Sequence, residues 1–168
     1  MRALMNRIYI PTRKYLESMF ADTKRSMLIL ALIGNLAGTF LLVTEDFGAW
    51  QDKDPFYGVS EGYVWWGSEK AFPWAQLFIL SLLVCHGFSA NVTVQRLGKG
   101  NTVTSGMIQR GYQSSLAATA LTLVFGVLFV VMVLDSDWWW FGGGFYGSLV
   151  GGIVASYALR VNQIKPNE

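Results

Sequence analysis

The sequence is poor in the residues on which soluble folds and most enzyme sites depend. Only 14% of its 168 residues are charged, against about a quarter in typical soluble domains, whereas 52% are hydrophobic. A single cysteine, Cys85, excludes an internal disulfide bond and a metal site built from cysteines. A single histidine, His86, lies in a hydrophobic stretch, so no Ser–His–Asp set is expected, and there is no phosphate-binding loop. The composition indicates a one-domain membrane protein that is not an enzyme.

Four stretches without Asp, Glu, Lys or Arg are long enough to cross a bilayer about 30 Å thick, which takes about 20 helical residues. They cover about residues 26–44, 72–94, 114–134 and 142–159. We therefore predict an all-α integral membrane protein, a bundle of four transmembrane helices over residues 26–159. A basic amphipathic segment, residues 1–25, precedes the bundle, an outer loop spans residues 45–71, and a tail covers residues 160–168.

The positive charges fall unevenly on the segments between the spans. Residues 1–25, 95–113 and 160–168 hold eleven of the thirteen Lys and Arg, and the loop 45–71 holds the other two. Because Lys and Arg collect on the cytoplasmic side, both termini are expected in the cytoplasm, with the bundle in the plasma membrane. No cleavage site is apparent, so the first span is expected to serve as the insertion signal. A short interfacial helix is expected to open at Pro11.

All seven tryptophans fall on the predicted outer side, where indole rings favour the headgroup level. They are Trp50, Trp65, Trp66, Trp74, Trp138, Trp139 and Trp140. We interpret them as interface anchors or as contact residues. The three consecutive tryptophans are predicted to form a tight turn between the third and fourth spans. Within the aromatic outer loop, residues 47–51 and 62–66 are predicted to pair as a small hairpin.

Small residues recur every four positions in the first and fourth spans, which places them on one helix face and allows close helix approach. They are Gly34, Gly38, Gly143, Gly147, Gly151 and Ala155. Packing inside the bundle is one interpretation of this stripe. The other is that the fourth helix also forms a homo-oligomer or binds a second membrane protein.

Two sets of ionisable residues are candidate ligand sites. His86 could ligate a haem or pigment metal or relay protons, or it could be a neutral histidine hydrogen-bonded inside the bundle. Four acids follow the outward ends of the first and third spans: Glu45, Asp46, Asp135 and Asp137. Together they could bind a cation such as Ca²⁺, or they could only mark the ends of the spans.

The arrangement of a large first outer loop containing tryptophan, a short second loop and two inner termini is similar to that of claudin-like tetraspan proteins. That family's first loop carries a cysteine pair, which is missing here, so the family is not assigned. The polar residues available to line a pore are sparse: Asn35, Thr39, Gln76, Ser81, His86, Ser89, Thr119 and Thr122.

The function predicted from these patterns is that of a non-enzymatic structural or accessory component of a membrane or envelope assembly. A small transporter or channel subunit is the first alternative, and a cofactor-binding protein built on His86 is the second. The expected partners are the lipid bilayer and either further copies of the chain or other membrane proteins. No nucleic acid partner is expected.

Overall fold

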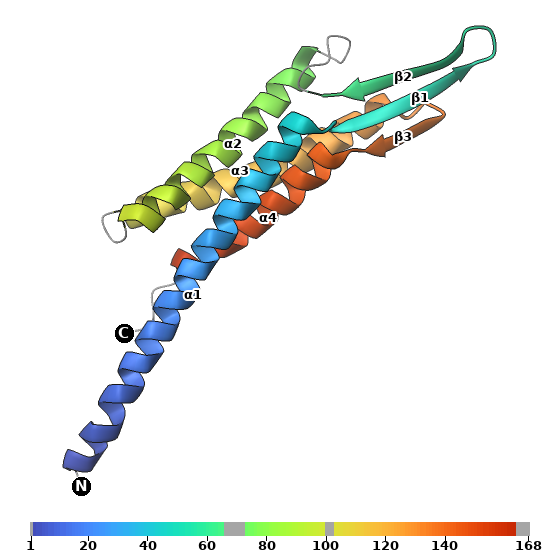
Figure 1. The fold of residues 1–168 in the computed structure, drawn as a ribbon. Coiled ribbons are helices and arrows are strands. Elements are labelled where there is room, and N and C mark those ends of the chain that lie inside the picture. The colour runs from blue at the N-terminus through green and yellow to red at the C-terminus, as the bar shows by residue number, and fades with distance from the viewer. Residues whose placement is uncertain (1, 66–72, 100–102, 164–168) are drawn as a thin grey trace.

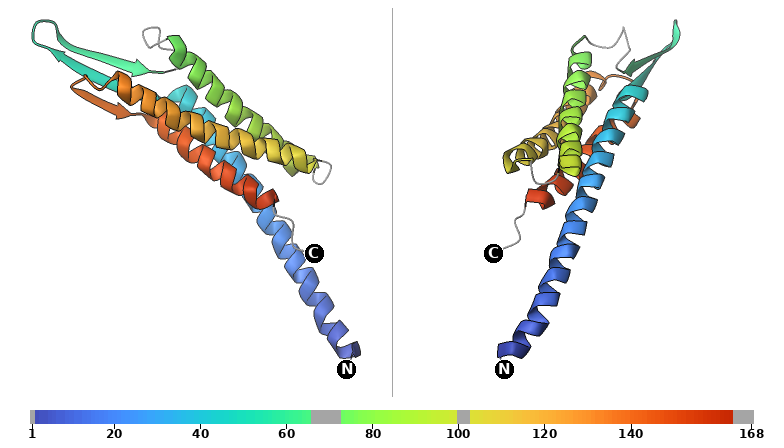
Figure 2. Two further views of the ribbon diagram at one scale, coloured as in Figure 1. Left: turned by 180° about the vertical axis from the view of Figure 1, so that it is seen from behind. Right: turned by 60° about the vertical axis from the view of Figure 1, so that its left-hand side comes forward.

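The computed structural model describes residues 2–65, 73–99 and 103–163, which form four helices and one small sheet (Figure 1). The helices are α1 (Arg2–Thr44), α2 (Pro73–Lys99), α3 (Ser105–Met132) and α4 (Gly143–Gln163). The strands are β1 (Gly48–Asp54), β2 (Gly58–Val64) and β3 (Trp138–Phe141). The helices run side by side as a bundle, and the sheet projects from one end of it (Figures 1 and 2).

Three of the helices contain segments long and apolar enough to cross a membrane. These segments are Asp22–Thr44, Ala75–Gly98 and Ser105–Met132. They confirm that the first three predicted spans are helices long and apolar enough to cross a membrane, while the fourth span stays a prediction. Helix α3 begins nine residues before the expected start, because Thr104 caps it by accepting a hydrogen bond from the Met107 backbone N–H at 3.3 Å.

Helix α1 is longer than the sequence indicated. We expected a separate short helix opening at Pro11, but the helix runs without a break from Arg2 to Thr44. No glycine or proline lies between Pro11 and the hydrophobic span, so nothing in that stretch ends the helix. The N-terminal half of α1 therefore extends beyond the other helices, at the end of the bundle opposite the sheet (Figures 1 and 2).

The sheet is antiparallel with strand order β2-β1-β3. The predicted hairpin is confirmed and is longer than expected, with Gly48 opposite Val64 at its base and Asp54 opposite Gly58 at its tip. Gly58 takes a φ of 85°, a left-handed conformation that favours glycine, where the chain re-enters β2. The tight turn predicted for the three tryptophans is wrong, because their backbone pairs as strand β3 with the free edge of β1.

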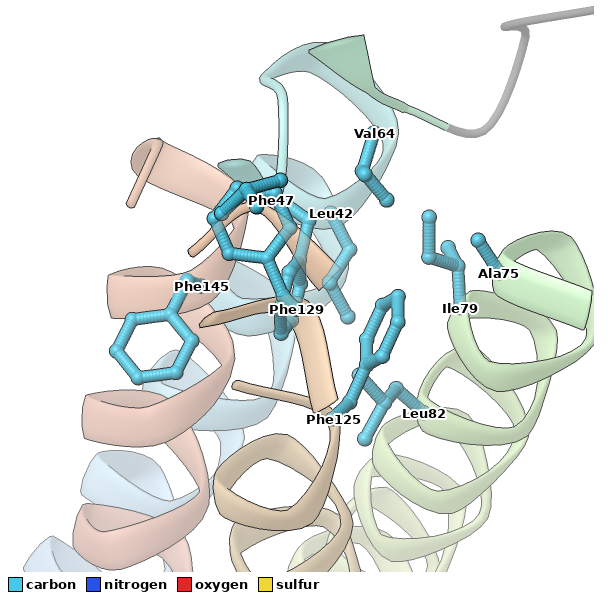
Figure 3. Close-up of a cluster of buried hydrophobic side chains, with 10 residues drawn as sticks. Leu42, Phe47, Val64, Ala75, Ile79, Leu82, Phe125, Phe129 and Phe145 are labelled. Carbon is cyan, nitrogen blue, oxygen red and sulfur yellow. The ribbon is translucent and has the colours of Figure 1, made fainter. Parts of the chain in front are cut away.

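The interior of the bundle is built in three layers along its length. Next to the sheet lies an aromatic layer (Figure 3), made of Leu42, Phe47, Val64, Ala75, Ile79, Leu82, Phe125, Phe129, Val133 and Phe145. Buried polar residues form the polar layer: Asn35, His86, Ser89, Thr93, Ser115, Thr122 and Ser148. At the far end lies an aliphatic layer of Leu28, Ala31, Val103, Ile108, Ala155, Ala158 and Leu159.

The outer surface of the helices is apolar. Phe40 on α1, Leu77 on α2 and Val127 on α3 are each about two-thirds exposed, at 64%, 65% and 64%. A water-soluble bundle would place such side chains inside and polar residues outside. Here the polar side chains lie at the centre, so the outward faces of these helices suit a lipid surround.

Candidate functional site

His86 lies at the centre of the polar layer and is fully buried. Its Nδ1 atom lies 3.1 Å from Oδ1 of Asn35 on α1, and its Nε2 atom lies 3.1 Å from Oγ of Ser148 on α4. One neutral tautomer meets both partners, since one ring nitrogen donates and the other accepts. The histidine thereby connects three helices, because its own backbone belongs to α2.

The hydrogen bonds continue on both sides of this histidine. The Asn35 amide donates to Oγ of Ser89 at 3.0 Å, and that hydroxyl lies 2.6 Å from Oγ of Ser115 on α3. On the other side, the Ser148 hydroxyl lies 2.7 Å from Oγ1 of Thr122, also on α3. The chain of polar contacts therefore passes through all four helices and returns to α3.

Only part of this polar layer was predicted from the sequence. Asn35, His86, Ser89 and Thr122 belong to the sparse polar residues named above, whereas Ser115 and Ser148, which complete the chain of contacts, do not. The remaining hydroxyls in that set bond within their own helices: Thr39 to Asn35 O, Ser81 to Leu77 O and Thr119 to Ser115 O. Only the packing distinguishes these two serines, because Ser148 contacts His86 and Ser115 contacts Ser89.

The surroundings of His86 bear directly on the predicted cofactor site. Both ring nitrogens lie within hydrogen-bond distance of protein side chains, so neither is left to ligate a metal in this arrangement. The ring also fills the space beside Gly38, where a Cβ atom would lie 2.9 Å from Cε1 of His86. The geometry matches the other interpretation, a histidine hydrogen-bonded inside the bundle.

The small-residue stripes lie where α1 meets α4, the most extensive contact between two elements in the described structure. A Cβ atom on Gly151 would collide with the backbone oxygen of Gly34, and one on Gly147 would lie 2.6 Å from Cβ of Leu41. Ala155 is fully buried beside Gly34. These residues therefore bring two helix backbones of the same chain into contact.

The glycine run that follows the tryptophans lies against the end of α1. A Cβ atom at Gly143 would lie 3.0 Å from Cγ of Glu45, and one at Gly144 would lie 2.9 Å from the backbone oxygen of Asp46. That same oxygen accepts a hydrogen bond from the Gly144 backbone N–H at 2.9 Å. Asp46 thus meets the first turn of α4 through its backbone oxygen.

The other two acids of the predicted cation site lie elsewhere. Asp137 accepts a hydrogen bond from the Lys53 backbone N–H at 2.7 Å, at the end of the β1–β3 ladder away from Asp46. Asp135 is exposed in the turn before β3. Among the described residues, no group of three or more His, Cys, Asp or Glu is placed to hold a metal ion. The four carboxylates are therefore not gathered into one site.

The two faces of the sheet differ because side chains alternate along each strand. Trp50, Trp139 and Phe141 lie on the face that packs against Phe129 of α3, with ring centroids 6.5, 6.4 and 5.7 Å away. The opposite side, which we call the exposed face, carries Ala49, Gln51, Lys53, Val59, Glu61, Tyr63, Trp138 and Trp140. The three consecutive tryptophans thus divide between the two faces.

Hydrogen bonds hold the carboxylate at the middle of the exposed face. Glu61 accepts from the Gln51 amide at 3.2 Å and from the Tyr63 hydroxyl at 2.8 Å. This hydrogen bond and the negative charge of Glu61 raise the pKa of Tyr63 above its ordinary value. On β3, Trp138 and Trp140 remain 63% and 46% exposed.

The remaining tryptophans have separate settings. The Trp65 indole donates to the backbone oxygen of Val43 at 3.1 Å, which ties the end of the hairpin to the end of α1. Trp66 and the side chain of Trp74 lie outside the described residues. The predicted anchoring role of the tryptophans stays a prediction.

Comparison of the chain with family models, with curated proteins and with solved structures found no match. The function is therefore inferred from the residues and their geometry. Two features carry that inference: the polar layer inside the bundle and the exposed face of the sheet.

Proposed function

We propose that the protein is a non-enzymatic, multi-pass membrane protein that acts by contact, as a structural or accessory component of a membrane assembly. All four helices cross the plasma membrane, both termini lie in the cytoplasm, and the sheet stands on the outer side. The exposed face of the sheet is the contact surface. The polar layer holds the four helices in one arrangement beneath it.

The surface of α4 supports the fourth span. Its outward positions carry Tyr146, Val150, Ile153 and Tyr157, which are all exposed and mostly apolar. The helix runs beside α1 and α3 within the bundle (Figure 2). A helix placed between two spans with an apolar outer face belongs in the same lipid layer.

The observation that supports the contact function is a firmly attached surface whose large side chains stay exposed among the described residues, with only Ala49 buried between its neighbours. Strand β1 is paired on both edges, and its inward tryptophan packs with Phe129. On the other side, large aromatic side chains of the exposed face remain accessible to solvent. A preorganised aromatic surface loses little conformational entropy on binding, and tryptophan and tyrosine are frequent hot-spot residues.

Site-specific photocrosslinking in native membranes tests the proposal. A photoreactive phenylalanine analogue replaces Trp138 on the exposed face, or Tyr146 on the lipid-facing side of α4 as the matched control. We expect a discrete protein adduct from position 138 and lipid adducts from position 146. Absence of any protein adduct from positions 138, 140 and 59 would refute the contact function.

Accessibility of introduced cysteines tests the orientation separately. In a Cys85→Ser background, Ser60→Cys at the hairpin should react with a membrane-impermeant thiol reagent in intact cells, and Ser105→Cys should not. The reverse pattern would invert the topology and move the sheet to the cytoplasm.

A transporter or channel subunit remains the second candidate, because the polar layer connects all four helices. Purified protein in liposomes distinguishes the two functions. Proton or cation flux above that of empty liposomes, abolished by His86→Leu, would favour transport over contact. Liposomes without such flux leave the contact function as the better account.

A further inference from the structure

We propose that the exposed face of the sheet binds a cationic segment of a partner protein, through lysine or arginine side chains. This inference rests on the proposed contact function and adds the chemistry of the partner. Two observations support the proposal: the order of side chains across the exposed face and the charge of the segments around that face.

Two cross-strand rows form the centre of the exposed face. One row runs from Trp140 through Ala49 to Tyr63, and the next runs from Trp138 through Gln51 to Glu61. Side chains directly opposite one another lie close together, so the carboxylate shares this face with two indoles and a phenol ring. A carboxylate combined with aromatic rings suits a lysine or arginine, since the rings attract a cation through their faces.

The central carboxylate is held in position but keeps capacity to bind. Its two oxygens each accept one hydrogen bond, at 3.2 Å from Gln51 and at 2.8 Å from Tyr63. A carboxylate accepts about four hydrogen bonds in all. Glu61 therefore enters an interface with its orientation already fixed and with acceptor positions left for a guanidinium or an ammonium group.

The segments around the face are predominantly acidic, with Lys53 as the one base, which lies on the exposed face itself. Residues 45–65 and 135–141 carry seven acids and a single base, Lys53, for a net charge of −6. A field of this sign attracts a basic segment and speeds its encounter with the face. The same field repels the anionic headgroups of a lipid surface, so a partner protein is the occupant that this charge favours.

Binding of a labelled hexa-arginine peptide to the full chain in phosphatidylcholine nanodiscs tests the proposal by fluorescence anisotropy. We expect binding that weakens with added salt. Glu61→Gln and Trp138→Ala should each weaken it by about two- to fivefold, the size of one exposed cation–π or ion-pair contact. A hexa-glutamate peptide should not bind.

Asp135→Asn is the matched control, because it removes the same charge from an exposed acid that lies off this face. An equal loss of affinity for Asp135→Asn and Glu61→Gln would show that the peptide responds only to the net charge of the region, and would overturn the proposal. A second result would also overturn the proposal: brominated lipid quenches the fluorescence of the wild-type indoles, and added peptide does not relieve the quenching. The exposed face would then bind the lipid surface.

The photocrosslinking experiment separates failure of this inference from failure of the proposed function. If protein adducts form from position 138 and persist in Glu61→Gln and at high salt, the contact function holds and the cationic chemistry is wrong. If no protein adduct forms from the exposed face, the contact function fails as well.

Discussion

The aromatic layer and the polar layer hold the same four helices together by different means. In the aromatic layer, large rings fill the space between the helices and the sheet, with Phe47 and Phe125 centroids 4.3 Å apart and Phe141 and Phe145 centroids 3.9 Å apart. In the polar layer, small side chains let the backbones of α1 and α4 touch, and hydrogen bonds join the helices across the centre.

The difference follows from what each layer packs against. In the aromatic layer the helices meet the sheet, and rings from α3, α4 and the strands pack against one another there. In the polar layer only helices meet one another, and inside lipid apolar side chains gain nothing from the hydrophobic effect by leaving the surface. Association in lipid depends on close packing and on hydrogen bonds between helices, which small residues and buried polar groups supply.

Phe129→Ala should give the largest loss of stability, because this ring is fully buried and joins α3 to both β1 and β3. Replacement of a buried phenylalanine by alanine typically costs about 3–5 kcal/mol. Unfolding in detergent, followed by tryptophan fluorescence, measures the loss. The control is Phe40→Ala, which removes a ring from the outward surface of α1. Equal losses for the two variants would remove the distinction between core and outer surface.

Gly151→Ile should come next, because its side chain would meet the backbone oxygen of Gly34, which cannot rotate away. Overpacking of this kind costs about 1–3 kcal/mol. Gly87→Ile is the matched control, since a Cβ atom there meets nothing within 4 Å. Thermal unfolding in detergent should show a large shift for the first variant and a small one for the second. A wild-type transition for Gly151→Ile would show that α1 and α4 do not need this close contact.

Asn35→Leu should cause a smaller loss of stability, which measures what the hydrogen bonds of the polar layer contribute. It leaves Nδ1 of His86 and the Ser89 hydroxyl without this partner. Hydrogen bonds between membrane helices are worth about 0.6–2 kcal/mol. Ser81→Ala serves as control, because that hydroxyl bonds only to its own helix at Leu77 O. A double-mutant cycle with His86→Leu should give a positive coupling, and additive effects would show that the two residues act independently.

The smallest expected effect is a change in the pKa of Tyr63, which involves only the exposed face. Its pKa is raised because the neutral hydroxyl donates to Glu61 and because the negative carboxylate disfavours the phenolate. Glu61→Gln should lower that pKa toward the ordinary value for tyrosine, as followed by ultraviolet absorbance between wild type and variant. The hydrogen bond that raises the pKa is formed by the neutral hydroxyl, so its contribution is present near pH 7 and is lost as the pH rises through the pKa of Tyr63. An unchanged titration curve would place the two side chains apart in solution.

The sequence by itself determined the features that depend on local pattern. A run of apolar residues long enough to cross a bilayer is helical in lipid wherever it occurs, because its backbone must satisfy its own hydrogen bonds. This is why the first three spans lie within α1, α2 and α3. The hairpin was also foreseeable, since turn formers separate two aromatic stretches. The spacing of Gly147 and Gly151 indicated one helix face, although not which helix it meets.

The tertiary structure alone decided which strands pair and which side chains of different helices meet. Strand β3 pairs with β1 across about ninety residues of chain, and that register sends Trp139 toward Phe129 and its two neighbours to the exposed face. Ser148 becomes a partner of His86 only because Gly147 and Gly151 bring α4 against α1. Hydrogen bonds between helices act over about 3 Å, so their partners depend on the packing of distant segments and leave no periodic signal in the chain.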